Sequence, residues 1–343
     1  MIDKYHSIII SRVAGIGDVL MLTPLLQGIK RKYPDIKLSI VTKENAYPLT
    51  QRMPFIDNAY VFTKTSKNEF ELIKSLWKQD VVFCADTSYR ISLIYFLARI
   101  KNRIGFPHKR GIYLNKPIEY ERWMDYSWEP YLHAMLFRNT TGIDVTTEDN
   151  WKSFYFPPAN DVEKEHVIKT FTSLGGKVDS DYIAVSLESS TWQKDWPIEY
   201  WLQLFSKLQQ KHIKFVILGG PSNQLANIKF PDNVIDMSGK TNLFEMGYMV
   251  QHAKLVVANS CLFLHVAYAF NIPSIGIYGR QPVWRDAPPN MFCSVVTDAP
   301  CAPCDLLIKP KGRCNNPFCM KRITVDKVYT AILKYFESIG IYL

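Results

Sequence analysis

The 343-residue sequence lacks any long apolar run. Apolar runs such as Ile8–Ile10 and Leu255–Ala258 fall far short of the ~18–20 residues that span a bilayer. It also lacks a positively charged start followed by an apolar stretch and a small-residue cleavage site. We therefore expect a cytoplasmic protein, and peripheral association with the inner face of a membrane stays open.

Cysteine is also scarce, and neither glycine nor charge is in excess. Seven cysteines are too few for a disulfide scaffold in a chain of this length. With 16 Gly, 20 Pro and 21% charged residues, the composition excludes a mostly disordered, a collagen-like and a coiled-coil chain. Because domains usually have ~100–200 residues, we expect one large or two medium domains.

Basic residues outnumber acidic ones, 41 to 32, and the net charge of +9 favours anionic partners. One short stretch without an acid contains Arg99, Lys101, Arg103, Lys109 and Arg110. This stretch is either a docking patch for a phosphate-bearing acceptor or a solvated surface. A second basic stretch is better interpreted as a solvated surface; it contains Lys309, Lys311, Arg313, Lys321 and Arg322.

Apolar strands alternate with helices in the first half of the chain. The predicted elements are strands Ser7–Val13, Leu38–Thr42 and Val81–Ala85, and helices Val19–Tyr33 and Tyr89–Arg99. Alternation of this kind predicts a parallel sheet with helices on both faces. The stretch 113–158 is less regular and rich in aromatic residues, and Pro157-Pro158 interrupts any regular element. We therefore divide the chain into domains 1–160 and 161–343.

A second alternating series follows a connecting helix Asp161–Ser173. Its predicted strands are Tyr182–Leu187, Phe215–Leu218, Val234–Met237, Leu255–Ala258 and Ser274–Tyr278. Its predicted helices are Ile198–Gln209, Leu243–His252, Cys261–Phe270 and Val325–Ser338, the last with Thr324 as N-cap. The fold class is therefore α/β, with two doubly wound Rossmann-like domains facing a cleft. Ligands in such sheets bind outside the carboxyl ends of the strands.

The first motif is the turn that contains Gly15, Gly17 and Asp18, where a strand leads into a helix. Its glycines allow a ligand to approach the backbone, and its free amides favour negative charge. The third glycine of a dinucleotide fingerprint is absent. Asp18 can act as a general base or can simply cap the helix.

The second motif lies between a strand and a helix, and contains Ser189, Ser190, Thr191 and Lys194. Three hydroxyls and one ammonium suit a diphosphate, although an ordinary polar loop would look the same. Two weaker signals lie further along. Asp236 ends a strand, where an acid can hold a ribose hydroxyl, and Lys240 follows in Gly239-Lys240-Thr241. The segment Asn259–His265 opens a helix, so the amides at Ser260 and Cys261 can meet a phosphate, whereas His265 is more often structural.

Four cysteines lie close together near the end of the chain: Cys301, Cys304, Cys314 and Cys319. Four thiolates suit a structural zinc or iron, and free thiols or two disulfides are the alternatives. The other three cysteines are predicted to lie in the core.

Taken together and in this order, the motifs resemble glycosyltransferase family 9, the heptosyltransferase-like enzymes with a GT-B fold. The resemblance covers nearly the whole chain, from "SRVAGIGDVLMLTP" through "SSTWQKDWP" and "LHVAYAFNIPSIGIYG" to "CAPC" and "CNNPFC". It implies an inverting transferase that uses a nucleotide sugar, commonly ADP-heptose, without a catalytic divalent metal. The resemblance gives Asp18 the role of base, and gives Ser189, Ser190, Thr191 and Lys194 the donor diphosphate. It places the acceptor on the N-terminal domain.

One departure from the family pattern leaves the donor sugar open. The family has Asp and Gly where this chain has Ser260 and Leu262, so one short hydroxyl replaces a carboxylate that accepts two sugar hydroxyls. We expect transfer of a sugar, heptose first, onto an anionic glycan such as a lipopolysaccharide core. A protein or nucleic-acid acceptor and a non-catalytic GT-B-like partner subunit are the alternatives.

Overall fold

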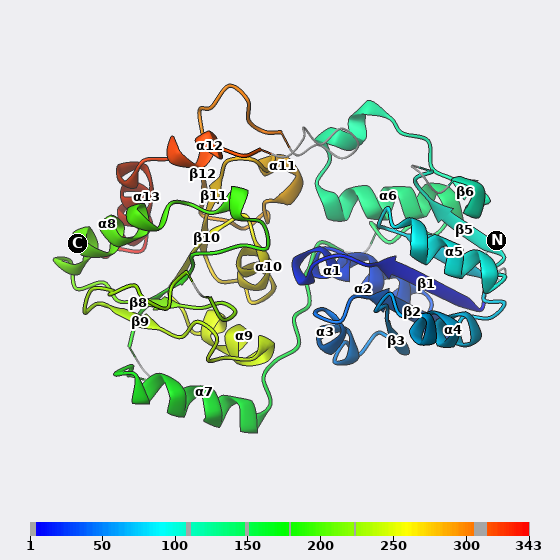
Figure 1. The fold of residues 1–343 in the computed structure, drawn as a ribbon, viewed down its shortest axis with the longest axis horizontal. Helices are drawn as coiled ribbons and strands as arrows, with labels where there is room; N and C mark the ends of the chain where they lie inside the picture. The colour runs from blue at the N-terminus through cyan, green and yellow to red at the C-terminus, as the bar shows by residue number, and fades with distance from the viewer. Residues whose placement is uncertain are drawn as a thin grey trace. The chain divides into compact units, whose positions relative to one another are not determined.

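The computed structural model describes residues 5–107, 111–147, 151–177, 180–222, 224–304 and 314–342. The chain divides into two units, Met1–Pro157 and Pro158–Leu343, and Figure 1 shows their elements. This division falls within the proline pair where the sequence interrupts regular structure. Lys109, Arg110, Lys309, Lys311 and Arg313 lie outside the described residues.

The first unit contains a six-stranded parallel sheet. Its order is β3 (Asn58–Val61), β2 (Lys37–Thr42), β1 (Ser7–Arg12), β4 (Val81–Cys84), β5 (Asn102–Gly105) and β6 (Lys116–Pro117). Ile8, Ile9 and Ile10 of β1 are all buried, although successive side chains point to opposite faces. Both faces of the sheet are therefore covered, which is why this strand has a continuous apolar sequence.

Helices of the first unit pack on both faces of its sheet. They are α1 (Ile16–Leu20), α2 (Thr23–Lys32), α3 (Tyr47–Gln51), α4 (Ser66–Ser75), α5 (Tyr89–Leu97) and α6 (Glu129–Thr141), with short 3-10 turns η1 (Gly111–Tyr113) and η2 (Arg122–Tyr126). On one face Val82 packs with Leu72 of α4 and Ile91 of α5. On the other, Phe83 contacts Phe137 of α6 edge to face.

Two predictions for this unit were wrong. The single helix expected over Val19–Tyr33 is two helices, because Pro24 has no backbone N–H to continue α1 and starts α2 instead. The hydroxyl of Thr23 donates to the carbonyl of Leu20, which fixes the break. The stretch expected to be irregular contains α6, a helix of 13 residues that begins with Pro130 in its first turn.

The second unit contains another six-stranded parallel sheet. Its order is β12 (Cys293–Val296), β11 (Ser274–Tyr278), β10 (Leu255–Asn259), β7 (Ile183–Ser186), β8 (Phe215–Ile217) and β9 (Val234–Asp236). Numbered within each unit, both sheets have the order 3-2-1-4-5-6. This order is typical of doubly wound nucleotide-binding sheets, and its switch point lies between the first and fourth strands.

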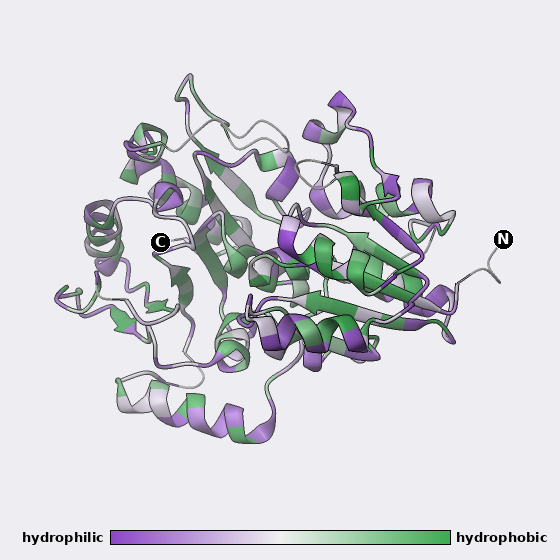
Figure 2. Cartoon of the chain, turned by 45° about the vertical axis from the view of Figure 1, so that its right-hand side comes forward, coloured by the Kyte–Doolittle hydropathy of each residue, from purple (hydrophilic) through white to green (hydrophobic). Residues whose placement is uncertain are grey.

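Helices of the second unit begin and end where the sequence predicts them in three cases: α7 (Asp161–Ser173), α8 (Ile198–Gln209) and α13 (Val325–Ser338). Thr324 caps α13, since its side chain accepts from the amide of Lys327. The others are α9 (Leu243–Gln251), α10 (Leu262–Ala269), α11 (Val283–Asp286) and α12 (Phe318–Lys321), and η3 (Trp192–Lys194) is a 3-10 turn. Figure 2 shows both sheets largely in the colour of apolar residues.

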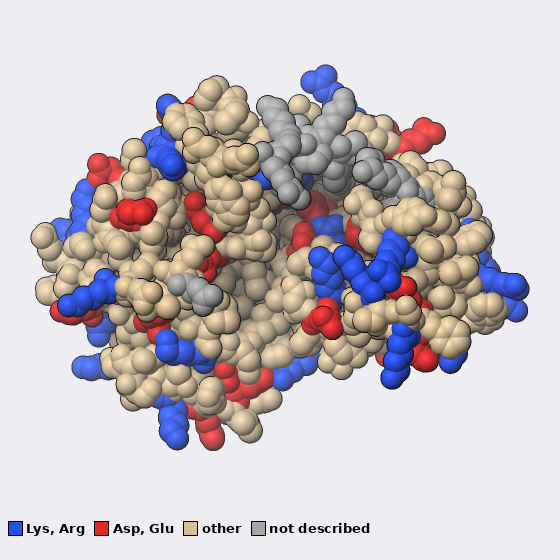
Figure 3. Space-filling view, in the orientation of Figure 1, with Lys and Arg blue, Asp and Glu red and all other residues tan. Residues whose placement is uncertain are grey.

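Charges of both signs are mixed over the face that Figure 3 shows. Among the helices that the structure describes, none is long and apolar enough to cross a membrane.

Candidate active site

Asp18 lies in the first turn of α1, directly after the carboxyl end of β1. One carboxylate oxygen, Oδ2, accepts the N–H of Gly15 at 2.8 Å, and Oδ1 accepts from Nη2 of Arg12 at 2.9 Å. The capping role considered from the sequence is thus present. The side chain is nevertheless 37% exposed, so an acceptor hydroxyl can reach it.

Arg12 connects Asp18 to residues far away in the chain. Its guanidinium also pairs with Glu129 at the start of α6, and it donates to the carbonyl of Ala85 after β4. Arg12 and Glu129 are only 12% and 11% exposed. The imidazole of His133, one turn further along α6, lies 3.4 Å from the Glu129 carboxylate. Asp18 is therefore the most accessible member of this charged cluster.

The pKa shifts of Arg12 and His133 indicate which groups of this cluster carry charge. Burial alone would lower the pKa of Arg12, but the carboxylates of Glu129 and Asp18 outweigh it and raise that pKa above its usual value. Burial lowers the pKa of His133, against the opposing effect of Glu129. The result is a fixed cation between carboxylates beside a neutral imidazole.

Asp86 marks the switch point of the first sheet, because it follows β4, the neighbour of β1. Its carboxylate accepts from the hydroxyl of Ser11 at 2.7 Å and from the amide of Val13 at 3.3 Å. These bonds tie the end of β1 to the end of β4. Asp18 is thus held at the edge where such sheets bind ligands.

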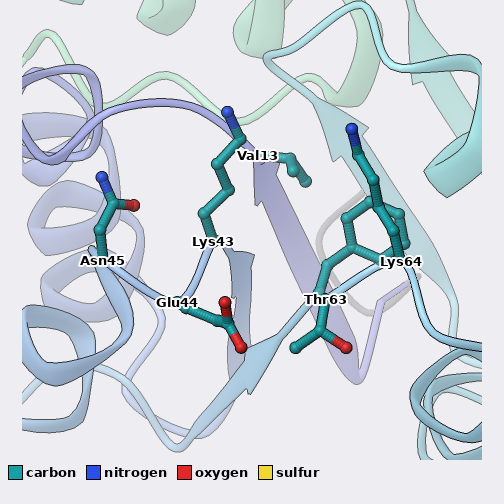
Figure 4. A pocket seen from close by; sticks show the side chains of 7 residues that line it. Val13, Lys43, Glu44, Asn45, Thr63 and Lys64 are labelled. Carbon is teal, nitrogen blue, oxygen red and sulfur yellow. The ribbon is translucent and has the colours of Figure 1, made fainter. Parts of the chain in front are cut away.

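A pocket of about 330 Å³ opens at the carboxyl ends of β1, β2 and β3. Its lining residues are Val13, Lys43, Glu44, Asn45, Phe62, Thr63 and Lys64. In Figure 4 the ammonium groups of Lys43 and Lys64 point the same way on either side of Val13, whereas the Glu44 carboxylate lies lower. Lys64 has a φ of 59°, which is uncommon for a residue with a side chain. The pocket offers two cations to an anionic group.

The first basic stretch has structural partners in the described residues. Lys101 pairs with Asp80 at 2.6 Å, and both residues lie before their strands, at the amino edge of the sheet. Arg103 donates to the carbonyls of Tyr113 and Ile100. The Arg99 guanidinium lies 5.3 Å from the ring of Trp77. Their role in acceptor binding stays a prediction.

The loop after β7 is held by its own hydrogen bonds. The hydroxyl of Ser189 donates to the carbonyl of Thr191 at 2.9 Å, and the amide of Ser189 donates to Asp195 at 2.7 Å. Burial raises the pKa of Asp195, while the bonds from Ser189 act against it. Ser190 is exposed on this loop. Ser189 therefore shapes the loop, while Thr191 and Lys194 are half-buried on it.

The segment after β10 lies beside this loop. The side chain of Asn259 accepts from the amide of Trp196 at 3.1 Å and donates to the carbonyl of Leu187 at 3.0 Å. Burial raises the pKa of Cys261, and the ammonium of Lys194 is close enough to oppose that rise. Since β7 and β10 are neighbours, Lys194, Ser260 and Cys261 gather at the switch point of the second sheet.

Other predicted donor residues lie elsewhere on this sheet. Asp236 ends β9 at the sheet's edge, two strands away from β7, and the ammonium of Lys240, which follows that strand, donates to the Asp236 carbonyl at 2.8 Å. His265 is buried in α10. Gly17 lies in α1, in the other unit. Asp236 and Lys240 therefore do not lie at the Lys194 loop.

The structure describes all seven cysteines, and none of them forms a disulfide. Burial raises the pKa of Cys319, and the thiols of Cys301, Cys304 and Cys314 raise it further, so the four lie near one another. Within the described ranges, no group of three or more His, Cys, Asp or Glu is arranged to hold a metal ion.

Sequence reasoning missed Arg12, Glu129, Lys43 and Lys64. Arg12 carried a signal, a cation at the end of an apolar strand just before the glycine turn. The two lysines each follow the end of a strand, which was a further signal. Glu129 carried no such signal in the sequence, because its partner Arg12 lies 117 residues away in the chain.

Two doubly wound sheets with polar groups at both switch points define the class of GT-B nucleotide-sugar transferases. A family model, "Glycosyltransferase family 9 (heptosyltransferase)", matches residues 69–305, and the chain belongs to this family.

Curated relatives and solved structures agree with this assignment. Lipopolysaccharide heptosyltransferase 3 of Escherichia coli is 23% identical over 297 residues, which cover 80% of this chain and 85% of the relative. Lipopolysaccharide core heptosyltransferase OpsX of Haemophilus influenzae is 23% identical over 308 residues, which cover 85% of this chain and 84% of the relative.

Three solved structures show the same fold. A family 9 glycosyltransferase from Veillonella parvula matches with a TM-score of 0.80 at 16% identity, over 98% of both chains. ADP-heptose heptosyltransferase II of E. coli matches with a TM-score of 0.73 at 18% identity, over 97% of this chain and 99% of that one. The iron-containing dodecameric glycosyltransferase TibC of E. coli matches with a TM-score of 0.61 at 15% identity, over 98% of this chain and 77% of that one.

Proposed function

We propose that this chain transfers a heptose from ADP-heptose to a lipopolysaccharide-core acceptor, with inversion at the anomeric carbon. The names of the curated relatives support heptose and a lipopolysaccharide core, and the solved ADP-heptose heptosyltransferase II of E. coli supports ADP-heptose as donor. The observation that carries the proposal is the accessible carboxylate of Asp18 at the switch point of the first sheet, held by a buried arginine.

Each polar group of the site has one role in the proposed transfer. Asp18 takes the proton of the acceptor hydroxyl, whose oxygen attacks the anomeric carbon as the bond to the diphosphate oxygen breaks. ADP leaves with the bonding electron pair. Negative charge develops on the diphosphate, and the ammonium of Lys194 with the hydroxyls of Ser190 and Thr191 stabilises it, so the step requires no divalent ion.

Lys43 and Lys64 are proposed to hold an anionic group of the acceptor, a phosphate or a sugar carboxylate. Their pocket lies over β1, β2 and β3, and Thr42 of β2 pairs in register with Arg12 of β1. An acceptor held there by its charged group can present a neighbouring hydroxyl to the end of β1. Lysine suits this task as a point charge.

The four clustered cysteines are proposed to take a structural zinc or iron. A four-thiol set is a suitable donor set for either, and the TibC structure is described as iron-containing. Binding would remove the thiol protons and reverse the raised pKa of Cys319. Metal analysis and thiol titration of anaerobically purified protein test this; four titrating thiols without metal would contradict it.

A transfer assay tests the main proposal. Purified protein is incubated with ADP-heptose and lipopolysaccharide cores truncated at successive sugars, and ADP release and product mass are measured. We expect one truncated core to gain one heptose. ADP-heptose that binds but is never transferred to any core, protein or nucleic acid would favour a non-catalytic subunit.

A further inference from the structure

The first unit carries an exposed apolar surface over α4, α5 and η1. We call it the docking surface; its members are Phe70, Trp77, Tyr89, Phe96, Leu97 and Ile112. Their exposed fractions run from 44% for Trp77 to 79% for Ile112. Helices α4 and α5 contact each other, and α5 contacts η1, so these side chains belong to adjacent elements.

Helix α5 has apolar side chains on its outer side as well as on its buried side, with Arg90, the partner of Glu69, as the charged residue among them. Ile91, Ile94 and Tyr95 are buried toward the sheet, yet Phe96 and Leu97 are almost half exposed. A surface helix normally has polar residues on its outer side, and an exposed group of apolar side chains marks an interaction site. Tyr89 and Phe96 contact the ring of Tyr113 in η1 yet stay almost half exposed, so packing inside the unit covers the outer side of α5 only in part.

Cations are interleaved with these apolar side chains. The Lys74 ammonium lies 4.2 Å from the centre of the Phe70 ring, and Arg99 lies 5.3 Å from that of Trp77. Arg103 lies 5.4 Å from the Phe96 ring. Among the described residues, no carboxylate is within ion-pair distance of Lys78, Arg99 or Arg103. The acids of α4, Glu69 and Glu71, are matched by Arg90 and Lys74, so the remaining cations give the surface a net positive charge.

We propose that the docking surface binds the enzyme to a bilayer that contains anionic lipid. Aromatic side chains prefer the headgroup region, and basic side chains are attracted to anionic headgroups. A bilayer supplies both partners over a broad area. This proposal rests on the proposed function, in which the acceptor is lipid-linked, and it names the face that meets the lipid.

The position of the surface agrees with that role. Helix α5 begins at Tyr89, three residues after Asp86, so one end of the surface lies at the edge of the sheet that holds Asp18. Its other end lies near Arg99, at the opposite edge. An acceptor anchored in the bilayer would thus meet the enzyme beside the catalytic carboxylate.

Vesicle sedimentation with the full-length protein tests the proposal. Partitioning is measured on vesicles of phosphatidylcholine alone and of phosphatidylcholine mixed with phosphatidylglycerol. Two surface variants are used, Lys74→Gln with Lys78→Gln, and Leu97→Ser with Ile112→Ser. The matched control is Val162→Ser with Lys169→Gln, an exposed apolar residue and an exposed cation of α7.

We expect partitioning on anionic vesicles to fall roughly ten- to thirty-fold in the charge variant, and to fall also in the apolar variant. The control should match the parent protein. Brominated lipid should quench tryptophan fluorescence, less in Trp77→Phe than in the parent. Equal partitioning of parent and both variants would overturn the proposal, as would equal binding to neutral and anionic vesicles.

A soluble, deacylated acceptor separates this proposal from the proposed function. Its KM and kcat should be the same in the surface variants and the parent. A raised KM with unchanged partitioning would show that the surface binds glycan instead of lipid. Absence of any transfer by the parent protein would contradict the proposed function alone, because partitioning is measured without it.

Discussion

A single buried guanidinium organises the carboxylates at the end of β1. Arg12 neutralises Glu129, which is buried, and leaves Asp18 exposed on its other side. Removing one partner of a buried ion pair typically destabilises a protein by about 3–5 kcal/mol, because the other charge is left unpaired. Arg12 is thus as necessary to the geometry of the carboxylate as to the stability of the unit.

Asp18→Asn should lower kcat about 10²–10⁴-fold, because the amide keeps the shape and cannot take a proton. Steady-state kinetics with ADP-heptose and the acceptor measure this. Glu163→Gln is the matched control, since Glu163 also closes a capping box, at the start of α7. Full turnover by Asp18→Asn with an unchanged fold would exclude Asp18 as the base.

Lys194→Ala should weaken binding of ADP-heptose by about 1.5–3 kcal/mol, the usual range for a hydrogen bond to a charged group. Titration calorimetry with ADP and ADP-heptose measures it. Lys240→Ala serves as control, because its ammonium is bound to its own turn two strands away. Equal losses in both variants would mean that the loop after β7 does not hold the diphosphate.

Lys43→Ala with Lys64→Ala should raise the KM for acceptor and leave the affinity for ADP-heptose unchanged. Lys37→Ala is the control: it removes an exposed lysine of the same strand β2, at the opposite end from the pocket. If the KM stays constant at low salt, where surface charges act most strongly, the acceptor's anionic group binds elsewhere.

At the scale of elements, the central strands, the edge strand β9 and most of the long helices follow from sequence pattern, whereas α6 and strands such as β5 and β6 do not. Strands β5 and β6 have four and two residues, with Arg103 and Pro117 among them, so they lack an apolar run. Their place comes from pairing in the sheet, β5 with β4 and β6 with β5. The turns of the site were predictable because glycine and hydroxyl residues follow strands, whereas the Arg12–Glu129 pair depends on tertiary contact.

The amino edge of the first sheet should be sensitive to pH through Asp80. Its carboxylate accepts the amides of His6 at 2.8 Å and Ser7 at 3.2 Å, and pairs with Lys101. Burial would raise the pKa of Asp80, but the bonds from Lys101 and His6 outweigh it and lower that pKa. Asp80→Asn should lower the free energy of unfolding by about 1–3 kcal/mol at neutral pH.

The sign of the pH effect follows from the lowered pKa. Asp80 contributes fully above its unfolded pKa of about 4, and its contribution is lost as pH falls through the lower folded value. Urea midpoints of the parent and Asp80→Asn should therefore converge in acid. A gap that stays constant from neutral pH to strong acid would contradict the assignment.

At the scale of the whole molecule, the chain repeats one topology in two units that do different work. Each unit has its own core and the same strand order, so each can present a switch point. The first places a carboxylate there, and the second places hydroxyls and a lysine. A reaction between an acceptor hydroxyl and a diphosphate-linked sugar needs both sets.

This division predicts where a donor analogue stabilises the molecule. ADP at ~100 times its dissociation constant should stabilise the folded state by ~2.7 kcal/mol. Hydrogen exchange should slow in the segments after β7 and β10, which carry Lys194 and Cys261, because bound ADP opposes their local opening. Lys194→Ala should reduce this protection at the same ADP concentration, and Lys240→Ala should not. Protection confined to Met1–Pro157 would instead place the nucleotide in the first unit and reverse the roles of the two switch points.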